Sequence, residues 1–280
     1  MKKFKPTSPG RRGMTGINYR ELLSGDKPMK SLVKGRRRGS GRNADGRITT
    51  RHKGGGVKRK FRDVDFLYDK KDIPARVETV EYDPNRSGFI ARVVFMDGER
   101  RYVLLPKGVA VGDTIVTSET AKVAPGNRLP LKKIPTGTFI YNIELKPAGG
   151  AKIVRSAGSY AEVQAHDGGY VQVKLPSTEI RKIVDTAWAT VGSVSNEEHG
   201  LVRLGKAGRS RKLGVRPTVR GSAMGSHDHP HGGGEGKAGR GHRRARSKWG
   251  KPTGKGQKTR APKKYSNKFI VSRRKVGKRR

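Results

Sequence analysis

The stretch that decides the fold is residues 77–105, which read Val-Glu-Thr-Val-Glu-Tyr-Asp-Pro-Asn-Arg-Ser-Gly-Phe-Ile-Ala-Arg-Val-Val-Phe-Met-Asp-Gly-Glu-Arg-Arg-Tyr-Val-Leu-Leu. A β-branched run at 77–82 ends at Asp-Pro-Asn-Arg-Ser-Gly, where proline and glycine supply turn dihedrals. The apolar run at 89–95 leads to Asp97-Gly98, a strong indication of a short hairpin, and a third run follows at 101–105. The stretch therefore predicts a three-stranded antiparallel meander.

Working outward, short strand patterns recur through the middle of the chain. They are expected at 114–117, 138–145, 161–165 and 170–175. Many short strands at close spacing are typical of small barrels, and about 140 residues is more than one five-stranded barrel needs. The Pro- and Gly-containing segment 124–130 is the expected seam between two β-barrels in series. Helical patterns are few: a turn or two at 18–23 and one turn at 177–181. The fold class is mainly β.

Charge divides the chain in the same way. Residues 1–60 hold 19 Lys and Arg against 3 Asp and Glu, residues 61–200 hold 19 against 18, and residues 201–280 hold 26 against 2. The prediction is a basic N-terminal extension (1–60), a first barrel (61–125), a second barrel (126–200) and a basic, Gly-rich C-terminal extension (201–280).

The two extensions indicate the partner. A chain with an isoelectric point of about 11.1 repels itself unless a polyanion neutralises it, and the commonest cellular polyanion is nucleic acid. The extensions hold few large apolar residues, so alone we expect them to be disordered. Glycines interrupt their charges, as at 39–42, 51–56 and 232–234, and let backbone amides approach phosphate oxygens. A flexible linker would explain the glycine but not the Arg and Lys placed through it, so threading into a folded polyanion is the favoured interpretation.

The sequence lacks the features that are typical of other classes of protein. The chain has no cysteine, so it has neither disulfides nor thiolate zinc sites. No apolar run approaches a membrane span, and the start at 1–6 lacks the apolar stretch of a signal peptide, so we expect a cytoplasmic protein without membrane contact. No phosphate-binding loop, nucleophile elbow or dinucleotide fingerprint occurs, and we expect no enzymatic activity and no cofactor.

The densest chemical cluster is 227–236, with His227, His229 and His231 beside Asp228 and Glu235. Neutral imidazoles can bind transition metals, but no predicted strand or helix fixes these ligands, so we expect no resident metal. The surrounding cations should lower the histidine pKa values, which favours hydrogen bonding to RNA over proton transfer.

Two loop arginines in the barrels are candidates for phosphate contact. Arg86 lies at the tip of the first predicted hairpin, and Arg155 precedes Ser-Ala-Gly between strands of the second barrel. Loops on a rigid scaffold commonly carry such contacts, and the alternative is a solvated surface arginine.

At these motifs the chain resembles a known family, large-subunit ribosomal protein two, in its bacterial form. The matching stretches follow one another through nearly the whole chain: 4–12, 46–56, 81–86, 142–144, 155–158, 214–221, 228–236, 249–253 and 268–271. Arg-Pro-Thr-Val-Arg-Gly at 216–221 and Asp-His-Pro-His-Gly-Gly-Gly-Glu-Gly at 228–236 are the most specific of them.

The resemblance implies an OB-fold-like barrel followed by an SH3-like barrel, with both extensions penetrating large-subunit ribosomal RNA. It implies a primary rRNA-binding structural protein that supports assembly of the peptidyl transferase region and association of the subunits. The catalyst there is RNA, and the C-terminal extension with His229 approaches it. Implied partners are that RNA, neighbouring ribosomal proteins and the small subunit at an intersubunit bridge. The residues expected to bind rRNA are Arg51, His52, Lys53, Gly54, Gly55, Arg86, Arg155, Arg216, Arg220, His229, His231, Trp249 and Lys251.

Three departures from the family pattern affect local contacts. The family commonly has Asn-Pro-Val where this chain has Gly225-Ser226-His227, so His227 inherits no role. Residues 237–248 are more basic than usual for the family, and Val57 occupies a position where histidine is common. Two alternatives remain open from the residues: a free nucleic-acid chaperone or DNA-compacting protein, and a metal-dependent hydrolase built on 227–231.

Overall fold

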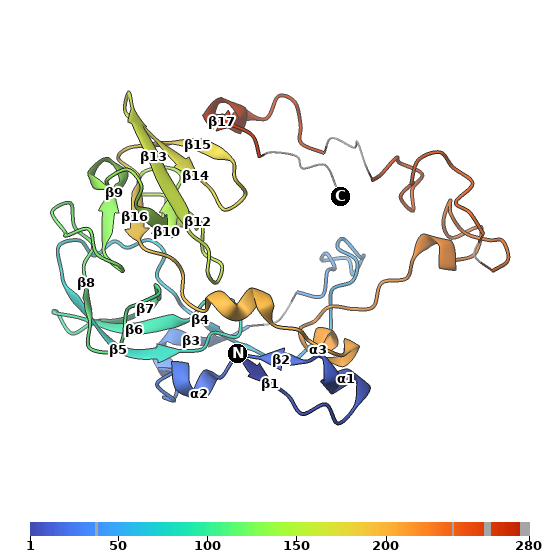
Figure 1. Ribbon diagram of the computed structural model, residues 1–280, viewed down its shortest axis with the longest axis horizontal. Helices are drawn as coiled ribbons and strands as arrows, with labels where there is room; N and C mark the ends of the chain where they lie inside the picture. Colours follow the sequence, from blue (N-terminus) through green and yellow to red (C-terminus); the bar gives the residue numbers. More distant parts are fainter. Residues whose placement is uncertain (37–38, 237, 255–258, 275–280) are drawn as a thin grey trace. The chain divides into compact units, whose positions relative to one another are not determined.

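The computed structural model describes residues 1–36, 39–236, 238–254 and 259–274. The chain divides into two compact units. The barrel unit comprises Met1–Arg38, Lys58–Ala207 and Ser266–Arg280, and the arm unit comprises Gly39–Val57 and Gly208–Tyr265. The predicted mainly β class, with curled sheets and few helices, is confirmed (Figure 1).

The first sheet contains the predicted meander. Its four antiparallel strands run in the order β7-β6-β5-β8, with bounds β5 (Ala75–Glu81), β6 (Ile90–Phe95), β7 (Arg100–Leu104) and β8 (Thr114–Ile115). One face buries Val77, Val93 and Val103 in a single cluster because alternate residues of a strand face the same side. The pair β3 (Val33–Gly35) and β4 (Lys60–Arg62) precedes this sheet in the chain.

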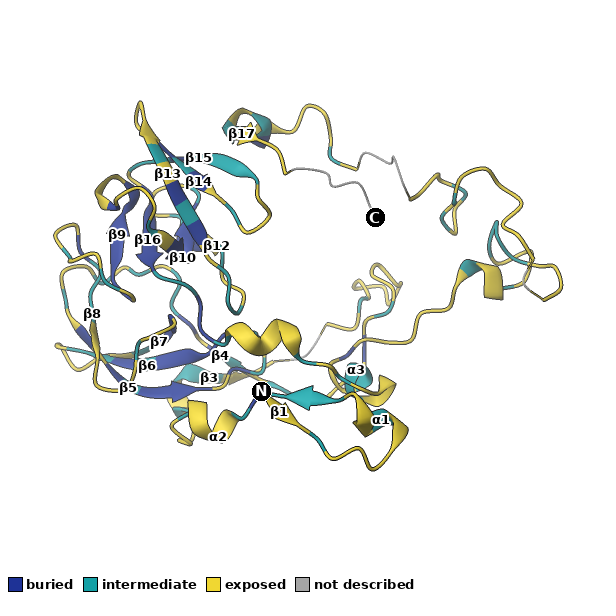
Figure 2. Cartoon of the chain, in the orientation of Figure 1, coloured by how far each residue is buried: buried dark blue, intermediate teal, exposed yellow. Residues whose placement is uncertain are grey.

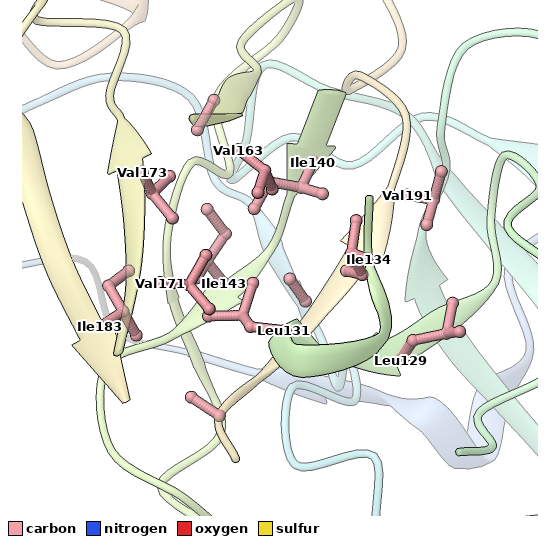
Figure 3. Packing of buried hydrophobic residues seen from close by; sticks show 13 residues of the cluster. Leu129, Leu131, Ile134, Ile140, Ile143, Val163, Val171, Val173, Ile183 and Val191 are labelled. Atoms are coloured by element: carbon pink, nitrogen blue, oxygen red, sulfur yellow. The ribbon is translucent and has the colours of Figure 1, made fainter. Parts of the chain in front are cut away.

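The second sheet has seven antiparallel strands in the order β17-β15-β14-β13-β10-β16-β9. Their bounds are β9 (Arg128–Pro130), β10 (Phe139–Tyr141), β13 (Ala161–Asp167), β14 (Tyr170–Lys174), β15 (Ile180–Val184), β16 (Trp188–Val191) and β17 (Ile270–Ser272). A short pair, β11 (Ile143–Glu144) and β12 (Ala151–Ile153), accompanies it. Thirteen buried apolar residues from these segments form its core (Figure 3), and the buried colour of Figure 2 follows the barrel strands.

One predicted element is wrong, and several strands were not predicted, among them β9, β15, β16 and β17. The turn of helix expected at 177–181 is absent: its last two residues open β15, which pairs along its length with β14 from Lys174↔Ile180 to Tyr170↔Val184. Pairing with a neighbouring strand overrode a weak local pattern. The C-terminal extension supplies β17, which pairs with β15 (Figure 1). The helical segment expected at 18–23 is confirmed as α2 (Tyr19–Leu22).

Polar contacts join the two sheets within the barrel unit. The Tyr141 hydroxyl donates to the Leu104 carbonyl at 3.1 Å, and the Phe89 amide donates to the Ser195 hydroxyl at 3.1 Å. The Arg128 guanidinium, 1% exposed, pairs with Glu144 at 2.9 Å and lies 4.4 Å from the Tyr68 ring centroid. These buried polar groups have partners, as burial requires.

The remaining elements are short. They are β1 (Lys2–Lys3), α1 (Pro9–Arg12), β2 (Thr15–Gly16), η1 (Lys30–Leu32), η2 (Leu131–Lys133), η3 (Glu197–Leu201), α3 (Ala207–Lys212), η4 (Gly221–Ala223) and η5 (Tyr265–Phe269). The described residues of the arm unit contain no strand of a named sheet, so other contacts hold that unit together.

Candidate nucleic-acid interface

Segments from both basic extensions pair in the arm unit. Lys53 and Val215 form an antiparallel bridge. The Gly54 amide donates to the Gly214 carbonyl at 3.1 Å, and the Arg216 amide donates to the His52 carbonyl at 3.0 Å. The two extensions, separated by the 140 residues 61–200, thus build one structure where the sequence indicated two separate arms.

This pairing encloses a cavity of about 370 Å³. Its lining contains four Lys and Arg side chains and no carboxylate. The lining residues are Ser40, Arg42, Ile48, Thr50, Arg51, His52, Lys53, Gly54, Gly55 and Arg216. Six of these are predicted rRNA-binding residues, contributed by both extensions. A concave lining whose charged side chains are all cationic has the electrostatics of a polyanion site.

Glycine conformation makes the cavity possible. Gly54, Gly55 and Gly56 follow one another at φ values of 135°, 62° and 94°, which side chains rarely adopt. Gly41 has φ 72°, and a Cβ there would collide with the Thr50 carbonyl oxygen. The three glycines thus let the backbone follow a path that other residues rarely adopt, and the Gly54 amide bonds the Gly214 carbonyl on this path.

A second part of the arm unit presents an aromatic ring. Backbone bonds from Ser247 to the Lys251 carbonyl (2.8 Å) and from Gly250 to the Ser247 carbonyl (3.0 Å) close a tight turn. Trp249 stands in this turn, 70% exposed, with the Arg51 guanidinium 5.4 Å from its ring centroid. An exposed tryptophan beside arginine and lysine suits base stacking and phosphate contact together.

The histidine cluster divides in two. The His231 amide donates to Nδ1 of His229 at 3.0 Å, and the Arg246 amide donates to Nε2 of His231 at 2.9 Å. Their rings lie 4.9 Å apart, whereas His227 is exposed and contacts its neighbour Asp228 at 3.4 Å. In the described ranges, no group of three or more His, Asp or Glu side chains could hold a metal ion.

The electrostatic surroundings of the pair agree with the sequence argument. Desolvation lowers the pKa of His231, and the neighbouring His229, Arg240, His242 and Arg246 lower it further. The neutral ring is therefore favoured, and it accepts the Arg246 amide bond. Part of the basic segment 237–248 borders the pair, and Lys237 itself lies outside the described residues.

Gly221 is a residue of this loop that the sequence did not single out. A Cβ on Gly221 would collide with the His229 ring. Arg220, one of the predicted contacts, precedes Gly221 and is exposed. Its backbone carbonyl accepts the Ala223 amide at 3.0 Å. In the sequence analysis Gly221 enters only as the last residue of the Arg-Pro-Thr-Val-Arg-Gly stretch at 216–221 and is assigned no role of its own.

Arg86 and Arg155 meet in the barrel unit at a residue that the sequence analysis missed. Their guanidinium carbons lie 5.2 Å and 4.4 Å from the centroid of the Phe66 ring. The Arg86 Nε donates to the buried Asp83 carboxylate at 2.6 Å, which fixes it at the hairpin tip. Burial, together with the positive charge of Arg86, lowers the pKa of Arg155.

The structure thus forms three groups from the predicted residues: the cavity, the turn at Trp249 with the histidine pair, and the arginine pair of the barrels. The contributors to which the sequence analysis assigned no role are Arg42, Gly221 and Phe66. Arg42 belongs to a Gly-spaced charge pattern in the sequence, but that pattern did not separate it from its neighbours. Among the described residues, no helix has the length and apolar character needed to cross a membrane.

Two family models match the chain. The one described as Ribosomal Proteins L2, RNA binding N-terminal domain, matches residues 29–117, and the one described as Ribosomal Proteins L2, C-terminal domain, matches residues 124–250. Together they cover well over half of the chain, in the expected order. The family is one of structural ribosomal proteins and is not an enzyme family. The chain therefore belongs to the ribosomal protein L2 family and is a structural, rRNA-binding component of the large ribosomal subunit.

Proposed function

We propose that this chain is a bacterial member of the family, a primary rRNA-binding protein that supports assembly of the peptidyl transferase region and subunit association in cytoplasmic ribosomes. The main support for RNA binding through the extensions is the cationic cavity, because residues of both extensions line it and no carboxylate does. RNA is the catalyst in that region, and the protein supplies position and charge neutralisation.

The proposed division of labour follows the charge. Barrels at 61–125 and 126–200 recognise rRNA by shape and phosphate contact through Arg86 and Arg155, and extensions at 1–60 and 201–280 neutralise buried RNA helices. The proposed contact residues of the extensions are Arg51, His52, Lys53, Gly54, Gly55, Arg216, Arg220, His229, His231, Trp249 and Lys251. Neighbouring ribosomal proteins and the small subunit at an intersubunit bridge are the further partners.

His229 is proposed to lie near the peptidyl transferase region as a hydrogen-bonding residue. Its Nδ1 accepts the His231 amide, so in the neutral ring the proton resides on Nε2. Nε2 then donates to an RNA oxygen, while Nδ1 accepts the His231 amide. This supports packing and orientation of RNA as the role of His229.

The test compares two triple variants of the full chain. R51A/K53A/R216A removes three cations of the cavity lining, and K133A/K146A/K152A removes three exposed cations from the second barrel. Filter binding measures affinity for a large-subunit rRNA fragment and for random RNA of equal length over a range of salt concentrations. The cavity variant should lose about 100-fold for the fragment, and its slope of log K against log salt should fall by about 2, since each released phosphate contact contributes about 0.7.

The control variant should lose much less affinity for the fragment, because its charges face solvent. Equal losses in the two variants, or parallel losses on fragment and random RNA, would show that net charge alone drives binding. That result would contradict the proposed site and favour a general nucleic-acid chaperone.

A further inference from the structure

The Phe66 ring contacts the guanidinium groups of both Arg86 and Arg155, although these two residues come from distant loops. Arg86 stands at the tip between β5 and β6, and Arg155 follows β12. Both guanidinium carbons lie within 5.2 Å of one ring centroid, inside the range of cation–π attraction. We propose that Phe66 is the positioning residue that holds Arg86 and Arg155 as a single two-guanidinium receptor for a phosphate group of the RNA backbone. This inference rests on the proposed RNA-contact role of the two arginines.

The ring packs on the first barrel, and the Phe66 backbone is bonded to the start of β12. Phe66 packs against Val64, Ile90 and Tyr102 of the first barrel. Its carbonyl accepts the Ala151 amide, at the start of β12, at 2.7 Å. Gly150 makes this approach possible, because it has φ 71° and a Cβ there would lie 2.9 Å from the Phe66 carbonyl oxygen. Phe66 is therefore a fixed support and not a mobile surface ring.

Arg86 is oriented by one carboxylate and keeps donors available. Its Nε bonds the side chain of Asp83, which is 0% exposed and also accepts the Asn85 amide at 2.8 Å. A guanidinium has five N–H donors, so the bond through Nε leaves Nη donors for a ligand. Because Asp83 is anchored by its own turn, the orientation of Arg86 is set before any RNA arrives.

Arg155 has no such carboxylate. Its Nη1 donates to the Ala151 carbonyl at 3.3 Å, and none of the ion pairs found among the described residues includes it. Two guanidinium groups thus share one ring, and only Arg86 has a carboxylate partner, which leaves a local excess of positive charge. Burial is the main cause of the lowered pKa of Arg155, and the positive charge of Arg86 lowers that pKa further. An anion between the groups would remove this repulsion.

The chemistry favours a phosphate as that anion. Planar guanidinium groups bind phosphate oxygens through paired, charge-assisted hydrogen bonds, and two of them can contact one group. A stacked base is disfavoured, because the guanidinium groups lie over the ring where a base would stack. Arg86 and Arg155 then bind as a unit, and loss of the ring disables both.

The test is a mutational cycle on the full chain. Phe66→Leu and Phe66→Met remove the π-system and keep an apolar side chain, Phe66→Tyr keeps the ring, and R86A/R155A removes both cations. Affinity for the large-subunit rRNA fragment is measured for each variant, and for F66L combined with R86A/R155A. We expect F66L and F66M to bind about 10-fold more weakly, F66Y to bind within about 2-fold of the wild type, and R86A/R155A to bind about 100-fold more weakly.

The combined variant decides the mechanism. If Phe66 acts through the arginines, F66L adds no further loss to R86A/R155A. A further loss of 10-fold in that background would mean that Phe66 contacts RNA itself or supports the fold, and would overturn the proposal. Wild-type affinity of F66L and F66M for the rRNA fragment would also overturn the proposal. Wild-type affinity of R86A/R155A would instead refute the RNA-contact role of the arginines, on which the inference rests.

Discussion

The barrel unit and the arm unit of this chain are stabilised in opposite ways. The barrel unit contains every buried apolar side chain found among the described residues, gathered in clusters between strands. In the described part of the arm unit only Gly54 and Gly214 are buried, and they are hydrogen-bonded to each other across the extensions. The arm unit also carries 21 Lys and Arg against 3 Asp and Glu.

This difference separates what each unit needs in order to fold. Each fully buried aliphatic side chain contributes about 1.5–3 kcal/mol, so the barrel cores stabilise themselves. The arm unit depends on backbone hydrogen bonds, each with a net contribution of about 1 kcal/mol, while its like charges repel. Its structure is therefore coupled to a polyanion that neutralises those charges. The family role in the ribosome supplies that polyanion as rRNA.

The largest effect should come from the barrel unit, at the buried pair of Arg128 and Glu144. Arg128→Met leaves the Glu144 carboxylate buried without its partner and should lower the free energy of unfolding by about 3–5 kcal/mol. Urea unfolding followed by Trp188 fluorescence measures it, with Trp249→Phe as background, because the chain has only two tryptophans. R128M/E144M should regain part of the loss. Equal instability of the single and double variants would mean that the unpaired carboxylate is not the cause.

The next effect should come from the arm unit without any change in the barrels. Gly41→Ala should close the cavity against Thr50 and weaken rRNA binding about tenfold, which corresponds to about 1.4 kcal/mol. Gly46→Ala is the matched control, since Gly46 has a similar φ of 75° and open space around it. Filter binding and Trp188 unfolding are measured together. A shifted unfolding midpoint in G41A would contradict the separation of the two units.

A smaller effect should follow at the histidine pair. Gly221→Ala pushes the His229 ring out of place, and Gly239→Ala meets nothing within 4 Å. Large subunits reconstituted with G221A should form peptide bonds about fivefold more slowly, as expected for one lost hydrogen bond of about 1 kcal/mol, with rRNA affinity unchanged. G239A should match the wild type. Normal rates with G221A would argue against an orienting role of His229.

The smallest effect is a pH dependence inside the same loop. The pKa of His231 is lowered in the folded chain, so the unfolded loop binds more protons, and the loop should lose stability as pH falls through the ordinary histidine range near 6.5. Protonation of Nε2 also removes the acceptor of the Arg246 amide. Amide exchange at Arg246, corrected for intrinsic rates, should accelerate as pH falls from 7.5 to about 5.5 in the wild type and in H227A. A pH-independent protection factor would exclude this coupling.

Local patterns predicted much of the barrels. The turn residues around Arg86 and at Asp97-Gly98 placed a hairpin and a meander that the structure confirms. The sequence analysis did not predict β15, because Ile180-Arg181-Lys182-Ile183-Val184 mixes charge with short apolar runs. Pairing with its neighbours β14 and β17 makes it a strand. Of the candidate site, the cations and glycines were predicted individually, but their grouping into one cavity was not.

The sequence by itself determined the kind of partner and the hairpins of the first sheet, because net charge, glycine spacing and turn residues are properties of short segments and simple sums. The tertiary structure alone decided which distant segments meet: β17 with β15, Gly54 with Gly214, and Arg86 and Arg155 on Phe66. Such contacts depend on packing and backbone hydrogen bonds between segments many residues apart, and no local pattern carries the identity of the partner.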